Sequence, residues 1–132
     1  HIGDATAQPI KAAGIRTAAL LGTKSTMELD FLKQRLARYE ISTLIPNKAD
    51  RNFINDSIFG ELEKEIINPK TKARFVEIID GLVSQGAEGV ILGCTEIPLL
   101  IKQADCSVPT FDTTELHADA VVSYALATHG HD

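Results

Sequence analysis

The chain has 132 residues, a length that fits one domain able to bury a hydrophobic core without disulfides or metals. Hydrophobic residues make up 44% of it and the mean hydropathy is +0.01, as in an ordinary soluble globular protein. The formal net charge of −5 argues against nucleic-acid binding, which needs a basic face. Apolar runs such as Gly89–Leu92 and Ile97–Ile101 are far too short to span a membrane, so we expect no membrane partner.

Cysteine usage and the N-terminus indicate the compartment. Cys94 and Cys106 do not make a disulfide framework, and no Cys or His spacing suggests a zinc site. No basic region followed by an apolar stretch marks a signal peptide. We therefore expect a reducing, cytoplasmic location. The chain opens on His1-Ile2-Gly3 without an initiator Met, which indicates the middle of a longer protein or a processed or trimmed one.

In the first half of the chain, short apolar runs alternate with helical patterns. A helix capped by Asp4 or Thr6 is predicted to stop at Gly14, where glycine tolerates a left-handed backbone. Arg16–Leu21 is typical of a buried parallel strand, and the β-rich run Ile41–Ile45 predicts a second strand. Between them lies a predicted helix with apolar residues at helical spacing, namely Met27, Phe31, Leu32, Leu36 and Tyr39.

The second half continues the alternation. A helix is predicted after Asp50 with one apolar side made by Phe53, Ile54, Ile58 and Leu62. Asn68-Pro69, a cap followed by a first-turn proline, opens another helix that ends at Gly86. Gly89–Leu92 then predicts the third strand, and Ile97–Ile101 a short helix.

A fourth strand and a last helix complete the predicted fold. Val108–Phe111 is the strand, and Asp112-Thr113-Thr114-Glu115 is a capping box that starts a helix to about Ala127. Because strands alternate with helices throughout, we expect an α/β fold, a three-layer α/β/α sandwich around a four-stranded, mainly parallel sheet.

Polar turns follow the first and third predicted strands, at the sheet edge where ligands of open α/β folds bind. The first turn is Gly22-Thr23-Lys24-Ser25-Thr26. One possibility is that this turn binds a carboxylate or phosphate. The alternative is that Ser25 or Thr23 only caps the helix that follows. No G-x-G-x-x-G pattern occurs, which argues against a dinucleotide site.

The second turn, Gly93-Cys94-Thr95-Glu96, carries a candidate nucleophile or base. The N–H groups of the following helix would stabilise a Cys94 thiolate and lower its pKa. Thr95 offers a hydroxyl and an N–H for an anion, and Glu96 could accept a hydrogen bond from a substrate ammonium group. Alternatively, Cys94 is a small buried hydrophobe and Glu96 a first-turn cap.

Other candidates are weaker on residue pattern alone. Cys106 lies in a polar loop before a proline, and His117 falls inside the last predicted helix. Lys64 ends an acidic stretch and is expected to be solvated. The pattern therefore supplies one candidate acid/base and no complete catalytic set.

The segment from Ile91 to Leu100, Ile-Leu-Gly-Cys-Thr-Glu-Ile-Pro-Leu-Leu, resembles the second active-site signature of aspartate/glutamate racemases. The resemblance extends in register over essentially all 132 residues. The opening of the family's second domain is matched by His1–Thr6. Its next loop and helix are matched by Leu20–Thr23, Thr26–Glu28 and Asp30-Phe31. Its closing strand and helix are matched by Val108–Thr114 and Leu116–Ala118.

The resemblance implies a two-lobed enzyme that uses neither pyridoxal phosphate nor metal. Each lobe presents one acid/base, typically cysteine, to opposite faces of the substrate Cα, and Cys94 corresponds to the second. Thr95 and Glu96 match positions that hold the amino acid's charged groups, as do Gly22 and Thr23 in the facing loop. Lys64 lies near a lysine that grips the distal carboxylate in some members, although Glu65 stands where glycine is usual.

This comparison implies that residues 1–107 form the second lobe and 108–132 a strand and helix that return to an N-terminal lobe absent here. We expect an acidic or broader amino-acid substrate, no racemisation by this chain alone, and a possible homodimer. Alternatives within the superfamily are a hydantoin racemase or a decarboxylase. An alternative of another class is a non-catalytic α/β ligand-binding domain.

Overall fold

The computed structural model describes residues 2–129, so His1 of the opening motif and residues 130–132 of the predicted closing segment lie outside it. The strands are β1 (Thr17–Leu21), β2 (Ser42–Leu44), β3 (Gly89–Leu92) and β4 (Thr110–Asp112). The α-helices are α1 (Ile2–Ala12), α2 (Lys24–Glu28), α3 (Phe31–Ala37), α4 (Lys48–Gly60), α5 (Pro69–Ser84), α6 (Ile97–Leu100) and α7 (Thr113–His129). Two short 3₁₀ helices are η1 (Leu62–Lys64) and η2 (Gln103–Asp105).

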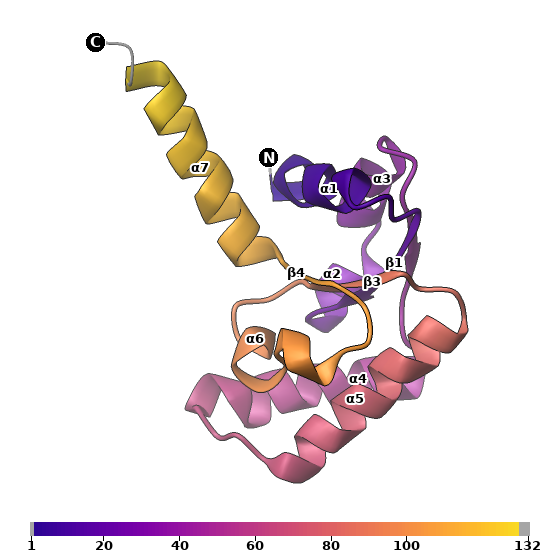
Figure 1. Ribbon diagram of the computed structural model, residues 1–132. Helices are drawn as coiled ribbons and strands as arrows, with labels where there is room; N and C mark the ends of the chain where they lie inside the picture. Colours follow the sequence, from indigo (N-terminus) through magenta and orange to yellow (C-terminus); the bar gives the residue numbers. More distant parts are fainter. Residues whose placement is uncertain (1, 130–132) are drawn as a thin grey trace.

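The four strands form one sheet in the order β2-β1-β3-β4, and every pairing is parallel. Helices α1 and α3 cover one face, while α4, α5 and α6 cover the other (Figure 1). The predicted three-layer α/β/α sandwich is confirmed, and the sheet is wholly rather than mainly parallel. Both faces are covered, which explains why β3 is apolar throughout and β1 is apolar after Thr17.

Two hydrophobic clusters fill the spaces on either side of the sheet. One joins Ala19, Leu21 and Val90 to helices α4 and α5, with the fully buried Phe75 at its centre. The other joins Ala18, Leu20 and Ile91 to helices α1 and α3. Alternate residues of β1 and β3 therefore pack in opposite clusters, because successive side chains of a strand point to opposite faces of the sheet.

The single helix predicted from Met27 to Tyr39 is wrong, because the chain breaks at Leu29, which is extended, and Asp30. Met27 is buried with α4 and α5, whereas Leu32 and Leu36 are buried in the other cluster. One straight helix cannot reach both faces of a sheet, so α2 and α3 are separate. The break leaves Leu29 64% and Phe31 66% exposed. The prediction that Phe31 belongs to the apolar side of a helix in the core is therefore wrong.

Several predicted helix ends are confirmed. Asn68 Oδ1 accepts a hydrogen bond from the Lys70 N–H at 2.9 Å, with Pro69 in the first turn. Gly14 has φ of +76°, the left-handed stop predicted for it, and Gly86, where another helix is predicted to end, has φ of +116°.

The predicted caps of two other helices are wrong. Helix α1 already includes Asp4 and Thr6, and the Thr6 hydroxyl donates to the Ile2 carbonyl oxygen at 2.8 Å. Helix α4 is capped by Asn47, and Asp50 lies inside its first turn.

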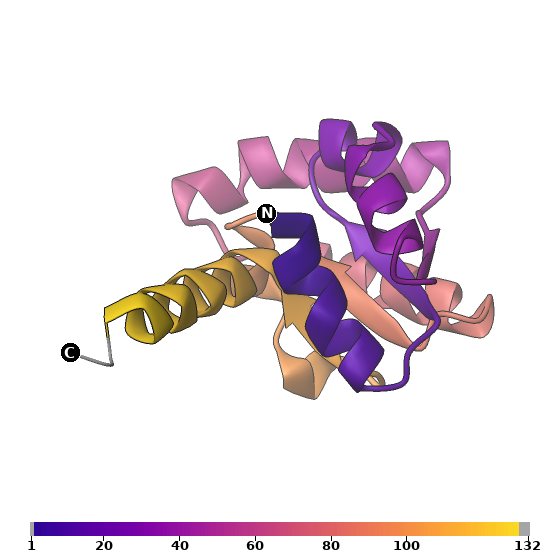
Figure 2. The same ribbon diagram turned by 90° about the horizontal axis from the view of Figure 1, so that it is seen from above.

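Helix α7 begins after Asp112, which caps it as predicted, and then extends beyond the body of the fold. Asp112 Oδ1 accepts hydrogen bonds from the Thr114 and Glu115 N–H groups at 3.0 and 3.3 Å. The helix passes beside α1 (Figure 2) and leaves Val121, Val122 and Leu126 exposed. None of the helices in residues 2–129 has both the length and the apolarity needed to cross a membrane.

Glu40 holds a left-handed backbone, with φ of +62°, in the turn between α3 and β2. We expect Glu40→Gly to raise the free energy of unfolding by about 0.5–1 kcal/mol, because relief of Cβ strain outweighs the added flexibility of the unfolded chain. Urea denaturation measures this. Glu40→Ala keeps the Cβ and should change stability little, and a gain equal to that of Glu40→Gly would contradict the strain explanation.

Candidate active site

The centre of the sheet is a switch point of the chain. Strand order places β1 beside β3, with β2 on one side of the pair and β4 on the other. The chain therefore leaves β1 and β3 in opposite directions, and the two turns diverge at the carboxyl ends of these strands. Ligands of open α/β sheets bind in the crevice that such divergence creates. The two turns here are those that carry Gly22 and Cys94.

Glycines let these turns approach each other closely. Leu21 pairs with Leu92 in the sheet, so Gly22 and Gly93 follow β1 and β3 at the same level. The Gly93 N–H donates to the Leu21 carbonyl oxygen at 2.7 Å. A Cβ on Gly93 would lie 3.0 Å from that oxygen, and one on Gly22 would lie 3.0 Å from Thr26 Cγ2. Backbone and threonine occupy the space that side chains would need.

Thr113 brings the end of a third strand to the same place. Leu92 pairs with Asp112 in the register of β3 and β4, so Thr113 follows at the level of Gly93. The Thr113 side chain is buried, and its hydroxyl donates to the Leu92 carbonyl oxygen at 3.3 Å. Thr113 was predicted to belong to a capping box and to the segment that resembles the family's closing strand, but not to the site. Its position directly after a short strand of a parallel sheet was the signal that could have identified it.

A pocket of about 270 Å³ opens where these strands end. Its polar wall is formed by Ser25, Thr26, Gly93 and Thr113. Its apolar wall is formed by Ile2, Leu29, Phe31 and Leu32. Leu29 and Phe31 are the exposed residues at the α2–α3 break, so the break that removes Phe31 from the core supplies one side of the pocket.

The Gly22–Thr26 turn is capped by Thr23 rather than by Ser25. Thr23 Oγ1 accepts from the Thr26 N–H at 3.5 Å and lies 3.2 Å from Thr26 Oγ1. One alternative read from the sequence, capping by Thr23, is therefore correct. Ser25 lines the pocket together with Thr26. Binding of a carboxylate by this turn stays a prediction.

Cys94 is half-buried against the core between the sheet and α5. Its Sγ accepts a hydrogen bond from the Ile97 N–H at 3.3 Å, the interaction expected to stabilise a thiolate. Nevertheless, burial raises the pKa of Cys94 to about 11, and the neighbouring Glu96 carboxylate adds to the rise. The expectation of a lowered pKa is wrong because loss of water outweighs hydrogen bonds from backbone N–H groups at a helix of only four residues.

The other site residues predicted in this region, Thr95, Glu96 and Lys64, do not line the pocket. Thr95 is exposed, and Glu96 precedes α6 without a side-chain capping bond, so the cap alternative for Glu96 is wrong. Lys64 is exposed on η1, which packs against α6. Glu65 follows with φ of +61°, a backbone that glycine adopts without strain. The residues lining the pocket include Gly93 but not Cys94, Thr23 or Lys64.

Among the side chains that the structure describes, no three His, Cys, Asp or Glu residues are grouped so as to hold a metal ion. Cys106 is partly buried against the same cluster as Cys94, and His117 is exposed on α7. The pocket itself offers the hydroxyl groups of Ser25, Thr26 and Thr113, and the Cys94 thiol follows Gly93 directly in the chain.

We expect Gly93→Ala to destabilise the fold by about 1–3 kcal/mol, because the new Cβ would press on the Leu21 carbonyl oxygen. Gly81→Ala is the matched control, since nothing lies within 4 Å of a Cβ at that exposed position of α5. It should stabilise the helix by about 0.5–1 kcal/mol. Chemical denaturation of both variants decides the matter, and equal effects at the two glycines would refute the close approach.

The alkylation of Cys94 by iodoacetamide should follow a titration with a midpoint near pH 11, because only the thiolate reacts. Glu96→Gln should move that midpoint down, since it removes the negative charge that opposes ionisation. A Cys106→Ser background isolates the signal in mass spectrometry. A midpoint below the ordinary thiol pKa would show that the turn activates Cys94 after all.

Comparisons with known proteins agree with this geometry. The model of the Asp/Glu/Hydantoin racemase family matches residues 1–121. A Yersinia pestis crystal structure of a protein proposed as an Asp/Glu racemase superposes with a TM-score of 0.92 at 45% identity over 96% of this chain. An aspartate racemase homologue from Pyrococcus horikoshii OT3 gives 0.87 at 42% identity over 94%. Glutamate racemase of Roseiflexus sp. (strain RS-1) is 28% identical over 123 residues, 90% of this chain.

The chain spans about half the length of these relatives, namely 55% and 54% of the two solved chains and 43% of the glutamate racemase. The family model nevertheless includes all three strand ends that form the pocket. The chain belongs to the Asp/Glu/Hydantoin racemase family.

Proposed function

We propose that the protein containing this chain is a cofactor-independent amino-acid racemase of the aspartate/glutamate type, in which Cys94 is one of two acid/bases. The observation that carries the proposal is the position of Cys94 at the switch point, one residue beyond the Gly93 wall of the pocket. Membership of the family supports the reaction class.

The raised pKa of Cys94 suits it to the acid role in the resting enzyme. At neutral pH the side chain is a thiol, because its pKa is about 11. A base on the opposite face of the substrate removes the Cα proton, and Cys94 gives its S–H proton to the carbanion, which inverts the centre. The thiolate left behind is a stronger base than an ordinary one and can start the reverse reaction. General acid–base steps of this kind contribute about 10²–10⁴-fold each.

Substrate binding is assigned to the polar groups around the pocket. Hydroxyl and N–H donors of the Gly22–Thr26 turn and Thr95 would hold the α-carboxylate, and Glu96 would accept from the ammonium group. Lys64, on η1 beside α6, would reach the distal carboxylate of an acidic substrate. Aspartate and glutamate are the first amino acids to test, with broader substrates as a further possibility.

The second acid/base is assigned to a further α/β lobe facing the pocket. The exposed apolar side chains of Leu29 and Phe31 on the pocket wall are suited to contact such a lobe. The greater length of the relatives is consistent with one. Residues 1–107 would then form one lobe and 108–132 the connection back to the other. A cytoplasmic location fits the need for a reduced Cys94, which is a free thiol here.

A non-catalytic ligand-binding domain is the second candidate. The observation in its favour is the half-burial of Cys94 with a raised pKa, since a thiol with little thiolate is usually inert. In that case the pocket would bind a small anion without chemistry at Cα, and substitution of Cys94 would leave binding intact.

Racemisation assays separate these candidates. In the whole protein that contains this chain, we expect Cys94→Ser to reduce interconversion of L- and D-aspartate or glutamate by at least about 10²-fold. Cys106→Ser, which changes the other partly buried cysteine, should remain active. Full activity of Cys94→Ser would eliminate the acid/base role. Inversion by the 132-residue chain alone would contradict the requirement for a second lobe.

A further inference from the structure

Helix α2 carries the polar turn of the pocket but is too short to hold its own position. It has five residues, and isolated helices of this length do not persist in water. Met27 anchors it in the core, while Lys24, Ser25 and Glu28 are exposed. The orientation of the turn therefore depends on what fixes the two ends of α2.

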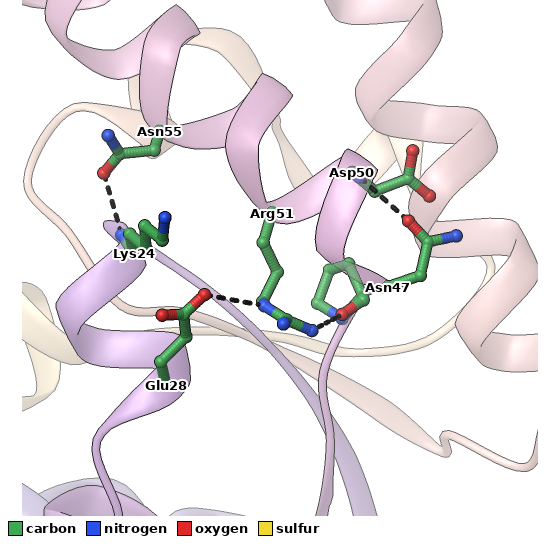
Figure 3. Close-up of polar contacts among 7 residues, drawn as sticks. Lys24, Glu28, Asn47, Asp50, Arg51 and Asn55 are labelled. Atoms are coloured by element: carbon green, nitrogen blue, oxygen red, sulfur yellow. Dashed lines mark hydrogen bonds and ion pairs between the residues drawn. The ribbon is translucent and has the colours of Figure 1, made fainter.

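Helix α4 contacts both ends of α2 (Figure 3). At the first residue of α2, Asn55 Oδ1 accepts a hydrogen bond from the Lys24 N–H at 2.8 Å. This N–H belongs to the first turn of the helix, where no carbonyl within the helix can accept it. Asn55 thus bonds to the backbone between Thr23 and Ser25, which fixes the turn itself rather than a side chain.

At the other end of α2, Arg51 joins two segments. Its Nε donates to Glu28 Oε2 at 3.1 Å, and its Nη1 donates to the Pro46 carbonyl oxygen at 2.7 Å (Figure 3). The Arg51 side chain is only 19% exposed, so water screens this pair less than an open surface pair. Arg51 therefore ties the last residue of α2 to the chain that follows β2.

Helix α4 is itself a firm support. Ile54 and Ile58 are buried in the core. Asn47 caps the helix by accepting from the Asp50 N–H at 2.9 Å, and Arg74 of α5 donates to Asp50 Oδ1 at 2.7 Å. Hydrogen bonds and ion pairs therefore connect α5 to α4 and α4 to α2, the helix that follows the polar turn of the pocket.

We propose that Asn55 and Arg51 are positioning residues, which hold α2 so that the Thr23–Thr26 turn presents its polar groups to the pocket. Neither lines the pocket. The inference rests on the proposed function for its effect on substrate, since the turn would bind the carboxylate. Asn55 has the larger effect because it bonds to the turn backbone, whereas the Glu28–Arg51 pair is partly solvated.

The test uses the whole protein that contains this chain, with amide hydrogen exchange and steady-state kinetics on aspartate and glutamate. Asn55→Ala should speed exchange of the Lys24 amide by about 10-fold and raise KM by about 2–10-fold, the equivalent of one hydrogen bond. Its kcat should stay within about twofold, because the turn binds ground state and transition state alike. Asn55→Asp keeps the acceptor oxygen and should restore both quantities.

Two further variants complete the design. Asp56→Ala alters an exposed neighbour on α4 and should leave the exchange rate and KM unchanged. Glu28→Ala breaks the Arg51 contact to α2 but keeps the bond from Arg51 to Pro46, and should raise KM less than Asn55→Ala does. Glu28→Ala also keeps the inference testable if Asn55→Ala fails to fold.

The two proposals fail separately. Unchanged Lys24 exchange in Asn55→Ala overturns the positioning role, whatever the racemase assay gives. Faster exchange with unchanged KM also overturns it, because the turn would then not govern substrate binding. If the wild-type protein racemises neither amino acid while Asn55→Ala exchanges faster, the racemase assignment fails and the support of the turn by Asn55 stands.

Discussion

The hydrogen bond from the Gly93 N–H to the Leu21 carbonyl oxygen, at 2.7 Å, continues the pairing of β1 and β3 one residue past the end of β3. It forces the two turns together at the point where the chain directions diverge. Glycine suits this position, since a Cβ at position 93 would lie 3.0 Å from that backbone oxygen, closer than an ordinary contact. The pocket walls, the place of Cys94 and the role of α2 all depend on this approach.

Packing against the core determines the electrostatics of Cys94. The thiol is half-buried against the cluster between the sheet and α5, where water stabilises its anion poorly. One N–H donor at 3.3 Å is insufficient compensation, so the pKa rises to about 11. A two-base racemase needs one protonated and one ionised partner at a time, and this environment favours the protonated form.

Sequence patterns predicted the fold well because each of its signals is local. Apolar runs marked β1 and β3, and Asn68-Pro69, Gly14 and Gly86 marked helix ends through their backbone preferences. The Met27–Tyr39 region was misread because helical spacing does not reveal that Met27 and Leu32 serve opposite faces of the sheet. Motifs placed the candidate site at Gly22–Thr26 and Gly93–Glu96.

The sequence could not show the rest of the site, since it depends on three-dimensional register and solvent access. Thr113 enters the pocket only because β4 pairs in step with β3. The pKa of Cys94 is raised because the side chain is buried, and burial cannot be inferred from residue spacing. Asn55 and Arg51 lie in no motif and act across the α2–α4 contact.

The most direct measurement is the position of an acidic amino acid in a crystal structure of the whole protein that contains this chain. The proposed racemase requires its Cα at about 3.5 Å from Cys94 Sγ, the separation of reacting atoms, with the α-carboxylate on the Gly22–Thr26 turn. An amino acid bound away from the carboxyl ends of β1 and β3, or with Cα out of reach of Cys94, would contradict it.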